Sequence, residues 1–360
     1  MRTSRSSRRA AGFSLVELMI GLVIGMVAIV VMMQVFSVSE GYKRTTTGGD
    51  DAQNNGAIAL YGLQRDIQQS GMGMSAFQLI GCDVLLRTGV TLNAMSPLTI
   101  NHSSIPSTAS DTNTDTLLVV YGNGNGSGEG AKVEAQPLQT TYTIAAAASS
   151  ASAPGAFVVG ASATTSDKVI VEAQPRPSPC SLTMEAVTAV AGTNVTVGTG
   201  VAGMSGGILY NLGQSPKVLV YAVKGGNLVM CDFIANDCGA AGNVGNAAIW
   251  VPIASNIVSL RAEYGRDTSA PMNATVDQFD QTTPTTACLW ARVSAARLAL
   301  VARSAQYDKG VVTAAAPAWA SASAAINLSG NTDWQHYRYK LFQTVVPLRN
   351  MTWQGVQAGC

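Results

Sequence analysis

The chain has 360 residues, of which 47% are hydrophobic and 12% are charged. This length suffices for one large domain or two ordinary ones, and the hydrophobic content excludes a disordered chain. The charged share is about half the usual one. Together with 36 glycines, it argues against a typical cytosolic enzyme and against a helical bundle, and two histidines leave little for His-based catalysis or metal binding.

The positive charge is concentrated at the N-terminus. Four arginines precede the first apolar run, and no acidic residue lies among them: Arg2, Arg5, Arg8 and Arg9. Removing residues 1–12 changes the formal net charge from +1 to −3. Because the remainder is slightly acidic and has no basic patch of the kind that binds phosphates, we expect no nucleic-acid partner.

The first apolar run is long enough to span a membrane. Residues 18–39 form 22 consecutive positions without a charge, and a helix of that length, roughly 33 Å, matches the hydrocarbon core of a bilayer. The arginines place residues 1–9 in the cytoplasm and the chain after about Glu40 outside. An ordinary secretory signal has a shorter apolar region with small residues after it, whereas here residues 10–12 (AAG) precede the run. We expect a retained anchor over about residues 13–38.

After the apolar run, the sequence predicts that the helix continues to about Ser70. Leu60, Leu63 and Ile67 recur at helical spacing, and Gly71 offers a C-terminal stop. The pair Gly48-Gly49 predicts a bend, a locally melted turn or a short linker.

From Gly71 onward, short β-type runs alternate with Gly, Pro and Asn, which indicates a largely antiparallel sheet. Lys217–Asp232 is the clearest hairpin, because Gly225-Gly226 can take positive φ at its turn. Residues 135–166 and 186–216 have no charge and are predicted to be loops and Thr/Ala strands. The predicted strands are 116–121, 168–171, 187–197, 217–223, 227–232, 257–264, 293–303 and 337–346.

No motif supports catalysis or a cofactor. Asp111–Asp115 (DTNTD) begins like a calcium loop but lacks the glycine and glutamate that complete one, and residues 122–130 (GNGNGSGEG) lack the features of a phosphate-binding loop. His102 and His336 lie in no catalytic motif. We therefore expect no enzyme and no cofactor.

Three acids follow a predicted strand closely enough to suggest a cation site. Asp267, Asp277 and Asp280 lie in residues 264–280 (YGRDTSAPMNATVDQFD), and calcium takes several such oxygens from a flexible loop. Solvated loop acids are the favoured interpretation, and a calcium site is the alternative.

All six cysteines lie beyond the apolar run, and their even number predicts disulfides in an oxidising compartment. Cys231 and Cys238 flank a short segment, so their pairing is the most economical, and an eight-residue ring contributes about 2.5 kcal/mol in the loop-entropy model. The pairing of the other four stays open: Cys82, Cys180, Cys288 and Cys360.

Residues 8–18 (RRAAGFSLVEL) resemble the class III signal of type IV pilins and type II secretion pseudopilins. The resemblance implies that a prepilin peptidase cleaves after Gly12 and that the new N-terminal Phe13 is methylated. The freed α-amino group is a cation for Glu17, in the same subunit or a neighbour, and their attraction in low dielectric would offset the cost of placing a carboxylate at membrane depth.

Three later segments resemble the PilW family of type IV minor pilins, and a fourth, residues 290–304, is similar. They are residues 63–71 (LQRDIQQSG), 258–267 (VSLRAEYGRD) and 337–350 (YRYKLFQTVVPLRN). Residues 74–215 carry little of this resemblance.

The resemblance implies a non-enzymatic minor pilin that primes pilus assembly in a tip complex and supports adhesion and twitching motility. Its expected partners are other minor pilins, the major pilin, a tip adhesin, the prepilin peptidase and the bacterial inner membrane. A minor pseudopilin of type II secretion and a membrane-anchored periplasmic binding module are the alternatives.

The expected fold is α+β and pilin-like: a long N-terminal helical spine, membrane-spanning in its first half, packed on a large, mostly antiparallel β-domain with disulfides. The expected domains are a cleaved leader over residues 1–12, a helix over 13–70, and a periplasmic or extracellular domain over 71–360. Two lobes, 71–250 and 251–360, are one arrangement of that domain.

Overall fold

The computed structural model describes residues 12, 14–74, 76–124, 128–145, 156–321, 325–352, 355–357 and 360, without the side chains of residues 44–48 and 51. The chain forms two units, residues 1–50 and 51–360, which are described separately. Helix α1 (Leu15–Gln69) supplies the first unit and continues into the second. Its backbone is helical through Gly48-Gly49, so the predicted melted turn or linker there is wrong.

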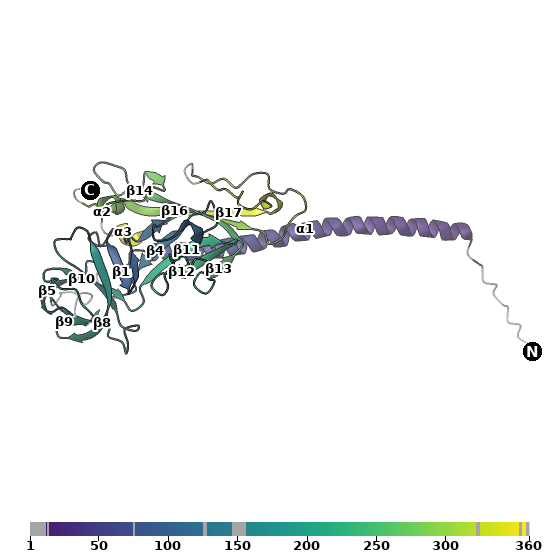
Figure 1. The fold of residues 1–360 in the computed structure, drawn as a ribbon. Helices are drawn as coiled ribbons and strands as arrows, with labels where there is room; N and C mark the ends of the chain where they lie inside the picture. Colours follow the sequence, from purple (N-terminus) through teal and green to yellow (C-terminus); the bar gives the residue numbers. More distant parts are fainter. Residues whose placement is uncertain are drawn as a thin grey trace, which may run out of the picture. The chain divides into compact units, whose positions relative to one another are not determined.

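The second unit holds three sheets (Figure 1). In the five-stranded sheet every pairing is antiparallel. The hairpin β11/β12 turns at Gly225 and Gly226, with φ of 58° and 74°, as two-residue hairpin turns require. In sheet order, its strands are β13 (Val251–Ser255), β12 (Asn227–Asp232), β11 (Lys217–Lys224), β4 (Leu117–Tyr121) and β3 (Leu98–Ile100).

The four-stranded sheet contains the longest paired strands of the second unit, and all its pairings are antiparallel. Helix α2 (Ala287–Ala291) directly precedes the strand at residues 293–303, and helix α3 (Arg349–Thr352) directly follows the strand at residues 339–347. In sheet order, its strands are β15 (Gln278–Asp280), β14 (Ile257–Arg266), β16 (Val293–Arg303) and β17 (Tyr339–Pro347).

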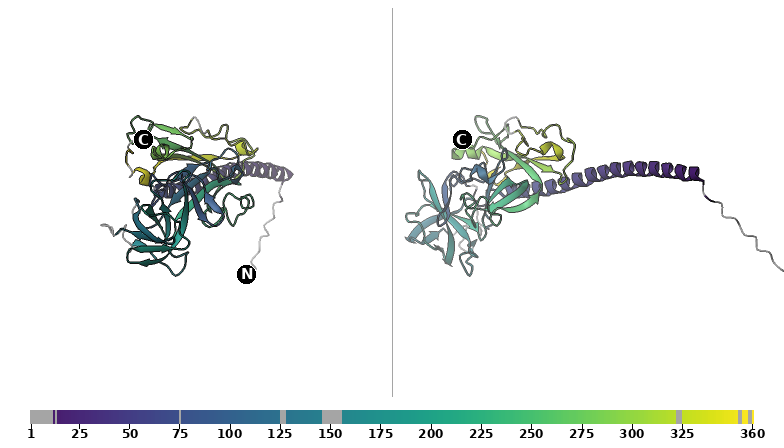
Figure 2. Two further views of the ribbon diagram at one scale, coloured as in Figure 1. Left: turned by 60° about the vertical axis from the view of Figure 1, so that its left-hand side comes forward. Right: turned by 45° about the vertical axis from the view of Figure 1, so that its right-hand side comes forward.

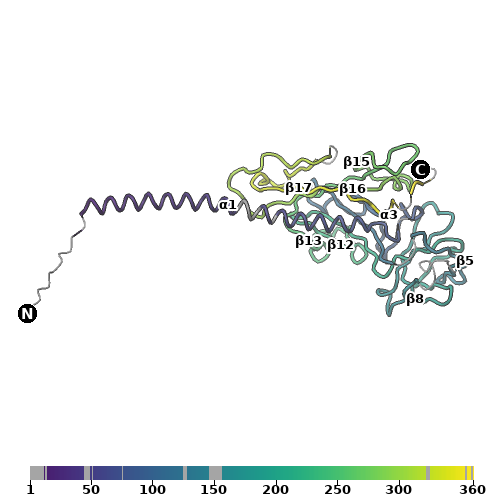
Figure 3. Tube along the Cα trace, turned by 180° about the vertical axis from the view of Figure 1, so that it is seen from behind, coloured from purple at the N-terminus to yellow at the C-terminus, as the bar shows by residue number. Residues whose placement is uncertain are grey.

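The eight-stranded sheet closes on itself. β8 pairs with β7 at one end of the order and with β9 at the other, so six strands form a closed barrel, and β1 and β2 extend from β8. Figure 3 shows this part of the chain beyond the end of α1. Its strands are β1 (Asp83–Arg87), β2 (Val90–Leu92), β5 (Ala131–Leu138), β6 (Thr141–Ile144), β7 (Lys168–Glu172), β8 (Ser181–Ala191), β9 (Asn194–Val197) and β10 (Ile208–Gly213).

The barrel is an insertion in the five-stranded sheet. β4 and β11 are neighbours in that sheet, and all six barrel strands lie between them in the chain. The two connecting segments touch where they leave the sheet: a Cβ on Gly213 would lie 2.3 Å from the backbone nitrogen of Gly124. Gly122 and Gly124 therefore allow a close backbone crossing.

All eight predicted strand segments contain strands. One of them, residues 187–197, is a hairpin rather than a single strand, because Gly192 takes a φ of 58° and reverses the chain between β8 and β9. The boundary proposed at residue 250 does not separate sheets, since β13 pairs with β12. Strands β1, β2, β3, β13 and β15 were not predicted, and β5, β6 and β10 lie partly or wholly in the segments 135–166 and 186–216, where Thr/Ala strands were predicted without bounds.

The C-terminal part of α1 lies in the largest core. Leu63 and Ile67 are buried together with residues of the five-stranded sheet, such as Tyr221, and of the four-stranded sheet, such as Leu298. Figure 2 shows both sheets beside this part of the helix. Gly56 makes room for β17, because a Cβ there would lie 2.1 Å from the Phe342 ring. The barrel has its own core, in which most residues are β-branched, such as Val133, and which also includes Leu209.

Candidate processing and assembly site

The predicted processing site lies at the start of α1. Gly12 is exposed, and no atom lies within 4 Å of the position that a Cβ would take there. Phe13 lies outside the described residues. Exposed backbone without helical hydrogen bonding is where proteolytic cleavage concentrates, and Gly12 precedes the first helical residue, Leu15.

Glu17 caps the helix that it belongs to. Its Oε2 atom accepts a hydrogen bond from the backbone nitrogen of Ser14 at 3.1 Å, and Leu18 donates to the Ser14 carbonyl. This is the glutamate half of a capping box, with Ser14 at the N-cap and Glu17 three residues later. A carboxylate in the first turn also interacts favourably with the helix dipole. Glu17 is therefore placed to receive N–H donors at the start of the helix.

The next residues form one candidate membrane span, Leu15–Lys43, with a mean hydropathy of 2.7. Its large apolar side chains are all exposed, from 52% at Val31 to 76% at Leu15. A helix that is apolar all round needs a lipid or protein environment rather than water.

The other end of α1 is fixed by polar contacts. Asp66 is buried, and the Tyr221 hydroxyl on β11 donates to its carboxylate. The Asn350 side-chain amide donates to the carbonyls of Gln69 and Ser70, at 3.1 and 2.9 Å. These carbonyls have no partner within the helix, so Asn350 caps α1 from the C-terminal segment. Burial and the carboxylate of Asp66 raise the pKa of Tyr121 to about 12, so the Tyr121 hydroxyl is neutral near pH 7.

Family models match both ends of this arrangement. The prokaryotic N-terminal methylation motif matches residues 7–33, and the model described as Type IV Pilus-assembly protein W matches residues 230–350. Residues 230–350 are thus similar to the PilW family, and the N-terminus carries a prepilin methylation motif. This motif and the apolar helix that follows it mark a membrane-anchored pilin that is incorporated into the pilus.

Other comparisons add little to this similarity. A search of curated proteins gave no match. A type IV-like pilin from Thermus thermophilus matches over 51% of this chain and 85% of its own length, at 14% identity and a TM-score of 0.19. That similarity is too low to support an argument.

Three disulfides tie the pilin's domain together. The structure pairs Cys231 with Cys238, the pairing that their spacing favours, and no described cysteine is free. Cys82–Cys180 joins the segment before β1 to the segment before β8, and Cys288–Cys360 holds the C-terminal residue against α2. Sequence spacing had left these last two pairings open.

The three loop acids do not converge on a cation. Asp280 pairs with Arg266, and Asp277 accepts hydrogen bonds from Thr268 and Ser269. Asp267 accepts from the backbone nitrogens of Ser269, Asn273 and Ala274. Among the described residues no group of three or more His, Cys, Asp or Glu is suited to a metal. The calcium alternative is therefore not supported, because these carboxylates organise their own loop.

The pKa shifts of these acids agree with that assignment. The Thr268 side chain is the main cause of the lowered pKa of Asp277. For Asp267, desolvation raises the pKa, but the hydrogen bonds from Ser269, Asn273 and Ala274 outweigh it and lower the pKa below its usual value. Hydrogen bonds to the charged form are what stabilise such carboxylates.

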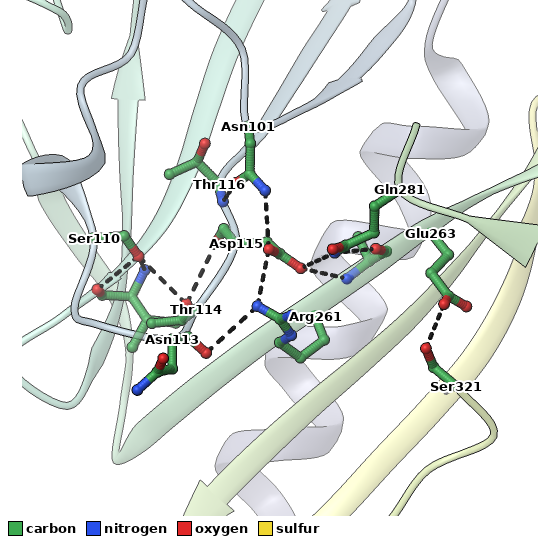
Figure 4. A network of polar contacts seen from close by, with 12 residues as sticks. Asn101, Ser110, Asn113, Thr114, Asp115, Thr116, Arg261, Glu263, Gln281 and Ser321 are labelled. Atoms are coloured by element: carbon green, nitrogen blue, oxygen red, sulfur yellow. Dashed lines mark hydrogen bonds and ion pairs between the residues drawn. The ribbon is translucent and has the colours of Figure 1, made fainter. Parts of the chain in front are cut away.

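Sequence reasoning missed a buried ionic network on the four-stranded sheet (Figure 4). Asp115 accepts from Asn101, from Arg261 at 3.0 Å, from the Ala262 backbone and from Gln281. Asp111, at the other end of the DTNTD motif, accepts from the backbone nitrogens at the β11/β12 turn. This motif therefore fastens the loop to two sheets.

A second buried acid, Glu263, lies on β14 itself. Glu263 is 1% exposed and accepts from Arg297 on β16 and from Ser321. Arg297 also lies over the Phe279 ring, at 4.4 Å. The available sequence signal was a charge on each apolar strand, but nothing in the sequence showed which charges are opposite one another.

Neither histidine lies in a cluster of catalytic groups. His102 is buried and its Nε2 lies 2.7 Å from the Asn93 carbonyl oxygen. Burial lowers its pKa, so the imidazole is neutral near pH 7. His336 stacks on Tyr307 and contacts the Asp308 carbonyl oxygen. The contacts of both histidines are therefore with backbone carbonyls and a neighbouring ring, as expected for residues that pack the fold.

Proposed function

We propose that this pilin is a minor pilin that primes assembly of the type IV pilus and sits in a tip complex with other minor pilins, supporting adhesion and twitching motility. The observation that carries the proposal is α1 itself, which joins a processing motif and an apolar membrane segment to an end fixed inside the domain. Its proposed partners are the other minor pilins, the major pilin, a tip adhesin and the prepilin peptidase.

Processing follows from the N-terminal motif. The peptidase removes residues 1–12 by cutting after Gly12, and the amine of Phe13 is then methylated. Glu17, which accepts the Ser14 N–H, meets this amine or that of a neighbouring subunit. A carboxylate at membrane depth costs a few kcal/mol when unpaired, so the pairing favours one axial register.

The remaining chain serves assembly rather than catalysis. We assign residues 13–70 to the helix, with about 13–38 in the membrane, and residues 71–360 to the displayed domain, with lobes at 71–250 and 251–360 as a working division. A first ring of subunits has unsatisfied interfaces, so a subunit with a large domain of its own lowers the barrier to starting a fibre and then remains at its tip.

A minor pseudopilin of type II secretion is the second candidate, because it uses the same signal and helix. Deleting the gene separates the two. Loss of surface fibres and twitching, restored by the intact gene, supports the pilus role. Normal fibres with loss of exoprotein secretion would instead support a role as a pseudopilin of type II secretion.

Point variants test processing and assembly separately. Gly12→Ala is expected to leave an uncut precursor that is absent from sheared fibres, detected by its mass. Glu17→Gln keeps the side-chain shape but removes the charge, so we expect normal cleavage and at least tenfold less protein in fibres. Normal processing of the first variant, or normal incorporation of the second, contradicts the corresponding role.

A further inference from the structure

A large groove lies in the displayed domain, away from the helix ends. It encloses about 1160 Å³, at the upper end of the size of small-molecule pockets. The lining residues come from two segments, 101–116 and 327–331, which are called the two walls, and from the β11/β12 turn, Val258, Arg303 and Tyr339.

The groove is lined mainly by neutral groups that both donate and accept hydrogen bonds. Hydroxyl and amide side chains come from both walls, including Ser103, Thr108, Thr112, Asn327 and Asn331. Ile105, Val258 and Leu328 add apolar surface between them. Such a mixture suits a ligand with many hydroxyls and small apolar faces, which is the surface of a sugar.

One arginine in the groove, Arg303, has no carboxylate partner among the residues that the structure describes. Arg303 lies 4.3 Å over the Tyr337 ring, and its buried Nε has no hydrogen-bond partner. Other arginines of this region each pair with a carboxylate among the described residues: Arg261, Arg266, Arg292, Arg297 and Arg338. Since an unpaired buried donor is costly and a guanidinium binds carboxylates with two parallel hydrogen bonds, Arg303 is suited to an incoming carboxylate.

The wall formed by segment 101–116 is held in place by hydrogen bonds within the protein. Asp115 ties the loop to β14, and Ser110 exchanges hydrogen bonds with Val223 on β11 (Figure 4). Asp111 is occupied by the turn nitrogens of Gly225 and Gly226. A wall fixed in this way loses little conformational entropy on binding.

We propose that this groove binds an acidic polysaccharide, with the carboxylate of a uronic acid residue on Arg303 and the sugar hydroxyls on the amide and hydroxyl side chains. Among the described lining residues Arg303 is the one arginine, and the acid that also lines the groove, Asp111, is occupied by the turn nitrogens of Gly225 and Gly226, so the lining fits one sugar carboxylate. An acidic peptide would be matched instead by several cations, which the groove does not offer. The proposal deepens the adhesion part of the proposed function, and it concerns binding by the isolated protein.

The test uses the full chain in detergent micelles and a hexamer of galacturonic acid, followed by titration calorimetry at 50 mM salt. We expect saturable binding that weakens as salt is raised, and weaker binding of a neutral glucose hexamer. Arg303→Gln is expected to lower the affinity at least tenfold, because it removes a charge-assisted bidentate contact. Arg87→Gln, at the exposed end of β1, is the matched control and is expected to change the affinity less than twofold.

A second variant guards against a folding defect. Thr112 is exposed and lines the groove, so Thr112→Trp fills the groove without altering Arg303, and it is expected to abolish binding while the thermal midpoint stays unchanged. Absence of binding by the wild type, equal affinity of Arg303→Gln, or tighter binding of an aspartate hexamer than of the sugar would each overturn the proposal. Because no fibre is involved, these failures leave the priming role untouched.

Discussion

The barrel and the four-stranded sheet bury their strands by different means. In the barrel, closure leaves no open edge among its six strands, and the interior is filled by residues such as Val187 and Leu209. Its buried Asp167 is paired with neutral donors. The four-stranded sheet has open edges; its Leu298 face shares a core with α1, and the ion pair of Glu263 with Arg297 lies on the opposite face. The barrel therefore buries its strands by closure, and the four-stranded sheet does so with a helix on one face and buried ion pairs on the other.

The two regions also differ in how they are joined to the rest of the domain. The four-stranded sheet shares one core with α1 and the five-stranded sheet. The barrel is attached by two chain crossings, by β1, and by Cys82–Cys180. We expect the barrel to open locally and the sheet around α1 to open only with global unfolding.

The largest effect is expected from breaking the buried pair on the four-stranded sheet. Glu263→Ala leaves Arg297 without its carboxylate, which costs about 3–5 kcal/mol of unfolding free energy for a buried pair. Urea denaturation of the full chain in micelles measures it. Glu134→Ala, in an exposed pair with Lys132, is the control and is expected to cost about 0–1 kcal/mol. Similar losses of unfolding free energy in both variants would mean that the buried pair stabilises the fold no more than the exposed pair does.

A comparable effect is expected where the barrel is tied to β1. The pair Cys82–Cys180 spans 98 residues, so replacing both by Ser is expected to cost about 4.7 kcal/mol in the loop-entropy model, against about 2.5 kcal/mol for the ring at Cys231–Cys238. Hydrogen exchange should show faster exchange in β5–β10 and unchanged exchange in β14 and β16. Equal acceleration in both regions would mean that they unfold as one unit.

A smaller effect is expected from Glu172, a buried barrel acid with an unpaired carboxylate oxygen. Glu172 is fully buried, its Oε1 has no hydrogen-bond partner, and burial raises its pKa. A carboxyl with a raised folded pKa contributes most below its unfolded pKa and loses that contribution as pH rises. Glu172→Gln is therefore expected to stabilise the chain by about 1 kcal/mol at pH 7.5 and to change little near pH 4. A thermal midpoint lowered at pH 7.5 would contradict this sign.

The same comparison shows which features the sequence could predict. The processing motif, the membrane helix and the β11/β12 hairpin rest on local patterns, and the strands of the four-stranded sheet are long apolar runs such as residues 293–303. Barrel closure could not be predicted, because it depends on the pairing of β9 with β6, whose segments are about 50 residues apart and carry no charge. The partners of Asp115 and Glu263 lie on other strands, so only the fold brings them together.

The central claim is that the chain enters a fibre as a processed minor pilin. The most direct measurement is mass spectrometry of sheared, purified pili. We predict a chain that begins at N-methylated Phe13, keeps three disulfides and is present at far below the amount of the major pilin. Its absence from the fibres, or its presence with residues 1–12 still attached, would contradict the account.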